Sequence, residues 1–351
     1  MKKISTVNVA DLVGPAPISR VTDKQIWSLM LSPQVKALLG PIETVTGPQV
    51  HETTEPLFPG DEVSNLNNNL IYGKPGFVRF PYVATIYKTV YGALVIKRDA
   101  SKFKVAAYVG DIMKGKGELM FVAALRDRRY DGTLRGNDCA MLGYPYDDPT
   151  NRPLPHNVKS VEISLYAFMP GSRISHATGD MELQTFVANP FAFCDRPELF
   201  RALFDRAWKT ERSPGQISAS IPDVAKILGP NFEKLALKHG YDFLEDAASH
   251  YHVAMFAHSL GYRITYEDQA KEFEALRAGI ERIKKSGKKL TRSQESWVCV
   301  AQSLPTHLIP EGLDLGGPKW PQDNISQTNL WTNKPLNQKA LELIPGQLKR
   351  D

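Results

Sequence analysis

The sequence is poor in cysteine and has none of the short motifs that mark common enzyme families. Three cysteines among 351 residues lie far apart and form no Cys-x-x-Cys pair, which argues against a disulfide framework or a zinc ribbon and favours a reducing compartment. A phosphate-binding P-loop, a dinucleotide-binding glycine fingerprint, a Gly-x-Ser-x-Gly elbow and a His-Glu-x-x-His pair are all missing. We therefore expect no enzyme activity, no cofactor and no metal, although missing motifs do not exclude an enzyme.

The chain also lacks long hydrophobic runs. No segment approaches the ~20 apolar residues of a membrane span, and Lys2 and Lys3 are followed by polar residues instead of the apolar core of a signal peptide. Hydrophobic residues make up 42% of the chain and charged residues 23%, which are ordinary proportions for a globular protein. The sequence therefore predicts a soluble, cytoplasmic protein with no membrane partner.

What the sequence does contain is a basic, β-rich central stretch from Lys74 to Arg135. This stretch has 13 Lys and Arg against 5 Asp and Glu, a net charge of +8, while the whole chain carries +5. The basic charge is thus local, as expected where a protein contacts an anionic partner. The Gly- and Lys-containing piece 110–117 predicts an exposed hairpin loop. Segments rich in Val, Ile, Tyr and Phe predict four strands, at 77–88, 91–97, 103–109 and 118–126.

Side chains alternate between the two faces of a strand, so the apolar positions of each predicted strand mark its buried side. The remaining positions include six cationic or aromatic side chains that are expected to point outward: Arg79, Tyr87, Lys102, Lys104, Tyr108 and Arg126. Such a face suits single-stranded nucleic acid, because cations contact phosphates and flat rings stack on bases with ~1–3 kcal/mol per base. The alternative is that these cations only solvate the outer face of a half-buried antiparallel sheet.

The sequence therefore predicts an interface for RNA or single-stranded DNA on this stretch. It comprises eleven residues: Arg79, Tyr87, Lys97, Lys102, Lys104, Tyr108, Lys114, Lys116, Arg126, Arg128 and Arg129. Binding through phosphate charge and ring stacking predicts strong salt dependence and weak sequence preference.

The rest of the chain has strand signals first and helix signals afterwards. Strands are predicted at 159–169 and 180–188. The clearest helix is 195–211, with Asp195 as its N-cap and an apolar stripe opposite a basic one. Further helices are predicted at 22–39 (with Thr22 as N-cap), 222–228, 231–239, 241–260, 265–286 and 291–302.

Two later segments carry further signals. The linker 284–292 has five cations and no acid, which predicts either a second phosphate-contacting site or a solvated helix end. The tail 303–351 is irregular, and Trp320 and Trp331 in it predict packing on the protein's own body or on a neighbouring subunit.

Histidines in the predicted helix 241–260 are the best candidates for a metal site. On one helix Asp246, His250 and His258 would share a face. A metal-dependent hydrolase built on Asp246 and His250 is therefore one alternative function, although helical metal sites usually add a carboxylate from another helix. The other interpretation is that these are half-buried helix histidines without a ligand role.

The predicted elements come in a characteristic order: several antiparallel strands, then a strand pair at 159–188, then an amphipathic helix. This order resembles Whirly and PUR-type single-stranded nucleic-acid-binding folds. The resemblance covers 74–211 and lacks the Whirly-type Lys-Gly-Lys-Ala-Ala signature. The resemblance is based on Arg79, Tyr87, Lys102, Lys104 and Tyr108 in the sheet and on Asp195 to Lys209 in the helix. The build is also similar to RNA-binding proteins of nucleus-forming jumbo bacteriophages, of the chimallin C type. That resemblance implies a viral protein that binds messenger RNA in an infected bacterium.

Taken together, the sequence predicts an α+β fold: a curved antiparallel β-sheet platform with a packed helix, followed by an α-helical region and irregular terminal arms. The expected function is non-catalytic binding of RNA or single-stranded DNA, by a monomer or a homo-oligomer, in the bacterial or infected-host cytoplasm. A viral structural or assembly protein is the alternative, because the chain has long irregular arms at both ends. The predicted segments are an N-terminal arm, helix and loop (1–73), a β-rich binding domain (74–215), a helical region (216–302) and a C-terminal tail (303–351).

Overall fold

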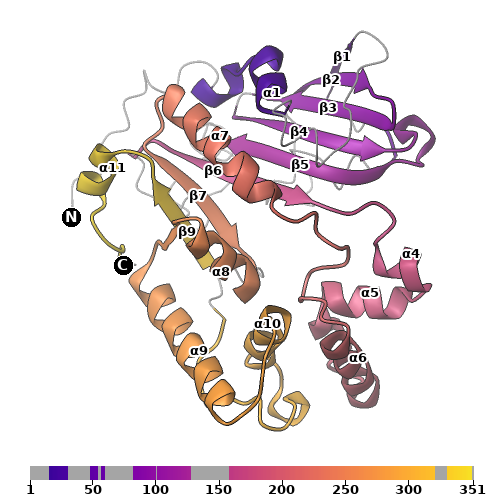
Figure 1. Cartoon of the computed structure of the whole chain (residues 1–351), viewed down its shortest axis with the longest axis vertical. Coiled ribbons are helices and arrows are strands. Elements are labelled where there is room, and N and C mark those ends of the chain that lie inside the picture. The colour runs from indigo at the N-terminus through magenta and orange to yellow at the C-terminus, as the bar shows by residue number, and fades with distance from the viewer. Residues whose placement is uncertain are drawn as a thin grey trace, which may run out of the picture. The chain divides into compact units, whose positions relative to one another are not determined.

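The computed structural model describes residues 16–30, 48–53, 57–59, 82–99, 101–127, 158–320 and 330–349. Helices and an open, mostly antiparallel sheet are mixed in this part of the chain (Figure 1). Within these residues the sheet has nine strands, in the order β1-β2-β3-β4-β5-β6-β7-β9-β8. The predicted α+β class is therefore confirmed.

The chain divides into two compact units. Unit 1 comprises Met1–Pro170, Ser220–Leu244 and Leu336–Ala340, and unit 2 comprises Gly171–Ala219, Glu245–Pro335 and Leu341–Asp351. The four predicted segments do not coincide with these units, because each unit is assembled from pieces that are distant in sequence.

Unit 1 is built on consecutive antiparallel strands. They are β1 (Gln49–Thr53), β2 (Tyr82–Lys88), β3 (Gly92–Arg98), β4 (Lys102–Val109), β5 (Glu118–Arg126) and β6 (Ser160–Ala167). The strands predicted at 91–97, 103–109, 118–126 and 159–169 are confirmed to within two residues at each end, and β2 is the described part of the strand predicted at 77–88. The predicted hairpin loop 110–117 joins β4 to β5 and contains the short helix η3 (Ile112–Lys114).

One face of this sheet, the core face, is covered by helices of unit 1. Fully buried apolar side chains on it include Leu94, Ile96, Val105 and Phe121. The 3-10 helix η2 (Pro17–Arg20) packs against β4, α7 (Val224–Lys238) against β6, and α1 (Asp23–Met30) against α7.

Polar contacts fix this cover in place. The Tyr241 hydroxyl donates to Asp127 Oδ2 at 2.9 Å and accepts from the Ile18 backbone N–H at 3.3 Å. Thr22 and Gln25 exchange hydrogen bonds at the start of α1, so the predicted N-cap is confirmed.

Unit 2 is mainly helical. Its helices are α4 (Ile174–Thr178), α5 (Met181–Ala188), η6 (Pro190–Phe193), α6 (Pro197–Lys209), α8 (Tyr251–Ser259), α9 (Glu267–Lys285), α10 (Arg292–Ala301) and η7 (Thr306–Leu308). The short strand β8 (Arg263–Ile264) pairs antiparallel with β9 (Leu330–Pro335). Two elements, β7 (Phe243–Ala248) and α11 (Gln338–Leu343), begin in unit 1 and end in unit 2.

The core of unit 2 centres on Trp297 of α10, which is fully buried. Its ring stacks on Phe186 of α5 at 5.7 Å and meets Phe204 of α6 edge-on at 5.5 Å. The tail tryptophans join this unit: Trp320 lies 6.3 Å from the ring of Phe273, and Trp331 is almost fully buried. The tail therefore packs on its own body.

Three secondary-structure predictions are wrong. The segment 180–188 is a helix, because the Asp180 side chain caps it by accepting from the Leu183 N–H at 2.8 Å. The segment 241–260 is not one helix but β7 followed by α8. The predicted break at Gly229-Pro230 lies inside the continuous helix α7, whose apolar side chains are buried before and after the proline.

One cap prediction is also wrong. Helix α6 begins at Pro197, with Arg196 and not Asp195 at the N-cap, because proline favours the first helical position. Helix α9 begins after Tyr266 without a side-chain cap. Among the described residues, no helix has the length and apolar character needed to cross a membrane.

Candidate nucleic-acid interface

The strand register places the predicted interface residues on opposite faces of the sheet. Tyr87 pairs with Leu94 on the core face, and its hydroxyl donates to Asp23 of α1 at 2.7 Å. Lys97 pairs with Lys104 on the other face. The predicted outward residues therefore do not form one surface.

The second face carries a cluster of cations that we call the lysine face: Lys97, Lys102, Lys104 and Arg126, with Glu162 beside them. Lys102 pairs with Arg126 across β4 and β5, and Arg126 pairs with Glu162 across β5 and β6. The Arg126 guanidinium lies 3.7 Å from the Glu162 carboxylate.

The lysine face is buried. Lys97 and Lys102 are each 2% exposed, Lys104 is 8% exposed and Tyr108 is 7% exposed. The prediction that Lys102, Lys104 and Tyr108 point into solvent is therefore wrong. These side chains are buried because both faces of the sheet are covered. Phe58, for example, meets Tyr108 edge-on at 5.5 Å, and the centroid of its ring lies 5.9 Å from Lys97 Nζ.

Burial lowers the pKa of Lys102 to about 8, against the opposing effect of Asp99, whose carboxylate lies 3.5 Å from Lys102 Nζ. The folded chain therefore binds fewer protons than the unfolded chain between about pH 8 and 10.5. It follows that this group makes the protein more stable as pH rises through that range.

We expect Lys102→Met to lose the rise in the free energy of unfolding between about pH 8 and 10.5, because methionine fills nearly the same volume and does not titrate. Asp99 keeps its hydrogen bonds from the Ser101 N–H and hydroxyl, both at 2.7 Å. Urea unfolding at pH 7 and pH 10 tests this, with the exposed Lys114→Met as control. A rise between the two pH values that is as large in Lys102→Met as in the unaltered protein contradicts it.

Other predicted residues have different environments. Arg126 is half-buried in its ion pair with Glu162. Arg79, Arg128 and Arg129 lie outside the described residues. Lys114, whose side chain is 75% exposed, and Lys116, which is also exposed, are the predicted residues that clearly face solvent.

These two lysines belong to an exposed end of the sheet that we call the hairpin end: Lys88, Val90 and Tyr91 from the β2–β3 turn, and Met113, Lys114 and Lys116 from the β4–β5 loop. Tyr91 is 57%, Val90 54% and Met113 57% exposed. The two loops touch, because the Gly110 N–H donates to the Tyr91 carbonyl at 2.8 Å. Gly110 has φ +89, and a Cβ there would lie 2.3 Å from the Lys116 carbonyl oxygen, so this close packing requires glycine.

The charges at the hairpin end are accessible. The Lys114 side chain lies 3.1 Å from Asp111, and its hydrogen bond lowers the pKa of that exposed carboxyl. Exposed ion pairs of this kind contribute little and exchange readily for other partners. Lys88 and Lys116 form no ion pair with a described residue. Sequence reasoning missed Val90 and Tyr91, although apolar side chains in a tight turn were a usable signal.

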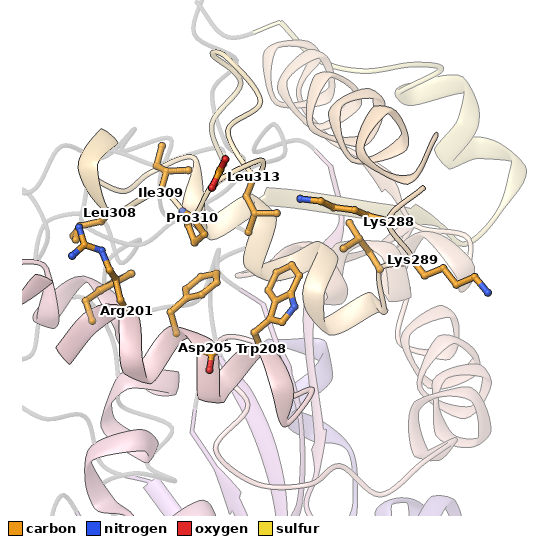
Figure 2. A pocket seen from close by; sticks show the side chains of 13 residues that line it. Arg201, Asp205, Trp208, Lys288, Lys289, Leu308, Ile309, Pro310 and Leu313 are labelled. Carbon is orange, nitrogen blue, oxygen red and sulfur yellow. The ribbon is translucent and has the colours of Figure 1, made fainter. Parts of the chain in front are cut away.

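Unit 2 contains a cavity of about 640 Å³ between α6 and the segment 308–313. Figure 2 shows Trp208 on one wall, Leu313 on the opposite wall, and Lys288 and Lys289 at one end. The predicted cationic linker 284–292 thus supplies two lining residues. Its Lys284 has a different role, because it is ion-paired with Glu281 and Glu295.

The predicted metal site is not assembled. Asp246 lies in β7 and His250 is the N-cap residue of α8, so they do not share a helix face. His250 instead contacts Ser249 Oγ at 2.9 Å, and His252 contacts Ser296 Oγ at 3.0 Å. Among the described residues there is no group of three or more His, Cys, Asp and Glu side chains suited to a metal ion.

Comparison of the chain with protein-family models, curated proteins and solved structures finds no match. The resemblance to Whirly, PUR-type and jumbo-phage proteins therefore stays a prediction.

Proposed function

We propose that the protein binds RNA or single-stranded DNA through the hairpin end of unit 1. The observation that carries this proposal is an exposed tyrosine beside three exposed lysines on two touching hairpin loops. The lysine face is not part of the proposed contact surface, because its three lysines are buried in the folded chain.

The chemistry of the hairpin end suits an unpaired strand. The Tyr91 ring offers a flat surface on which a base can stack, and Val90 and Met113 extend the apolar area around it. Lys88, Lys114 and Lys116 offer ammonium groups to successive phosphates. None of these groups reads base edges, so the proposal includes little sequence preference and strong salt dependence. Such a protein acts where single strands are accessible, as in bacterial or infected-host cytoplasm.

We expect the triple variant Tyr91→Ala, Lys114→Glu, Lys116→Glu to bind a labelled single-stranded RNA at least about tenfold more weakly, since it loses one stacking surface and two phosphate contacts. The slope of log affinity against log salt becomes shallower by about 1.4. Fluorescence anisotropy across a salt series measures both effects, and a duplex of equal length tests strand preference.

The matched control changes the same kinds of groups elsewhere in unit 1. It is Leu237→Ala, Lys234→Glu, Lys238→Glu on α7, where Leu237 is 40% exposed and both lysines face solvent. Equal affinity for the two triple variants places binding away from the hairpin end. No binding by the unaltered protein at low salt overturns the proposed function.

The assembly alternative has less support than it had from sequence. Trp320 and Trp331, for which packing on a neighbouring subunit was one expectation, are buried within unit 2. Sedimentation of the nucleic-acid-free protein distinguishes the two functions, because an assembly protein forms large particles that grow with concentration.

A further inference from the structure

We propose that the cavity between α6 and the segment 308–313 binds a small organic anion with a flat apolar body. The site lies within unit 2 and is independent of the nucleic-acid proposal for unit 1. Its volume of about 640 Å³ falls within the range of roughly 300–1,000 Å³ that is typical of small-molecule sites.

The apolar body of the ligand is expected to lie against Trp208. Rings of α6 form a stacked row, with Phe200 and Phe204 6.1 Å apart at 22° and Phe204 and Trp208 5.8 Å apart at 24°. The first two are buried in the core of unit 2, whereas Trp208 ends the row and is half-buried at the cavity. A flat ligand can therefore extend the row between Trp208 and Leu313 (Figure 2).

The charge of the lining selects an anion. Arg201 and Asp205 carry opposite charges and add no net charge to the lining. Neither Lys288 nor Lys289 forms an ion pair with a described residue, and Glu311 is the opposing acid in the lining. The charge left for a ligand is thus positive and lies at the lysine end.

The Lys288 ammonium group lies close to Gly312, in the segment that forms the wall opposite α6. A Cβ built on Gly312 would lie 2.7 Å from Lys288 Nζ, and Gly312 has φ +72. The glycine thus leaves room for the ammonium group beside the 308–313 backbone. The acid group of the ligand, a carboxylate, sulfonate or phosphate, is expected to bind there.

The test compares two fluorescent probes that share a ring system and differ in charge. Anilinonaphthalene sulfonate is the anion and N-phenylnaphthylamine is its neutral analogue. We expect the full-length protein to bind the anion at one saturable site about tenfold more tightly than the neutral probe, as the unshared ammonium group of Lys288 allows. Lys288→Gln with Lys289→Gln removes this difference, whereas Lys234→Gln with Lys238→Gln on α7 preserves it.

A second variant addresses the cavity itself. Ile309 is partly buried in its lining, and Ile309→Trp fills the space, so we expect it to lose binding of both probes. Equal affinity for the two probes, unchanged anion binding after Lys288→Gln and Lys289→Gln, or normal binding to Ile309→Trp overturns the proposal. RNA binding at the hairpin end is measured separately, so either proposal can fail without the other.

Discussion

Trp297→Ala is expected to lower the free energy of unfolding of unit 2 by about 4–5 kcal/mol. Large aromatic-to-alanine changes in a packed core cost about 3–5 kcal/mol, and Trp297 is fully buried among the rings of Phe186 and Phe204. The change also removes the hydrogen bond from Trp297 Nε1 to the Arg212 carbonyl, 2.7 Å long, which leaves a partly buried acceptor without its partner.

Guanidinium unfolding measures the loss in the free energy of unfolding. Hydrogen exchange followed by mass spectrometry is expected to show that the destabilised segments are α6 and α10. Trp208→Ala is the matched control, because Trp208 lies on the neighbouring ring row and is only half-buried. We expect it to cost under about 2 kcal/mol. Similar losses for the two variants contradict the central role of Trp297.

Elements with strong local signals could be predicted from the sequence. Strand β5 has the predicted bounds 118–126, because an alternating apolar pattern ends in Arg126 and the following polar residues. Helix α10 lies within the predicted 291–302, where Thr291 and Gln294 form a reciprocal capping box. Both signals depend on residues that are close together in the sequence, so they can be recognised without knowledge of the tertiary structure.

The apolar pattern of segment 180–188 fits both a strand and a helix. Met181, Leu183 and Val187 alternate as in a strand, while Leu183, Phe186 and Val187 also follow a helical spacing. The structure buries the second set. The helix is favoured by its N-cap, Asp180, whose side chain accepts a hydrogen bond from the Leu183 N–H. A strand prediction takes no account of such a cap.

The lysine face shows why exposure is harder to predict than alternation. The sequence placed Lys102 and Lys104 together on one side of β4, and the register agrees. It could not reveal that this side is covered as well as the other, because covering groups such as Phe58 come from distant segments. Residues 288–289, 308–313 and α6 likewise form one cavity only through tertiary packing.

Lowering the pH from 7 to 5 is expected to reduce the free energy of unfolding of unit 2 by about 3–4 kcal/mol through His250 and His252. Burial lowers the pKa of His250 to about 4. Burial, followed by the positive charges of His250 and Arg292, lowers the pKa of His252 to about 3. The unfolded chain takes up these protons near pH 6.5. Below that pH each histidine therefore lowers the free energy of unfolding by about 1.4 kcal/mol per pH unit.

The packing around the two rings explains why they stay neutral. Their centroids lie 5.7 Å apart, and a Cβ on Gly215 would approach His250 Cε1 to 2.8 Å. Each Nδ1 already has a serine partner, Ser249 for His250 and Ser296 for His252. Protonating either ring places a charge beside the other ring, and the burial of the two rings disfavours that charge.

The double variant His250→Asn, His252→Asn is therefore expected to lose most of the acid sensitivity, because asparagine keeps polar atoms near the Nδ1 positions and does not titrate. Guanidinium unfolding of unit 2 at pH 7, 6 and 5 measures the slope for both proteins. His258→Asn is the matched control, since His258 lies on the same helix and is exposed at its end. An equally steep loss in the double variant would assign the acid sensitivity to other groups.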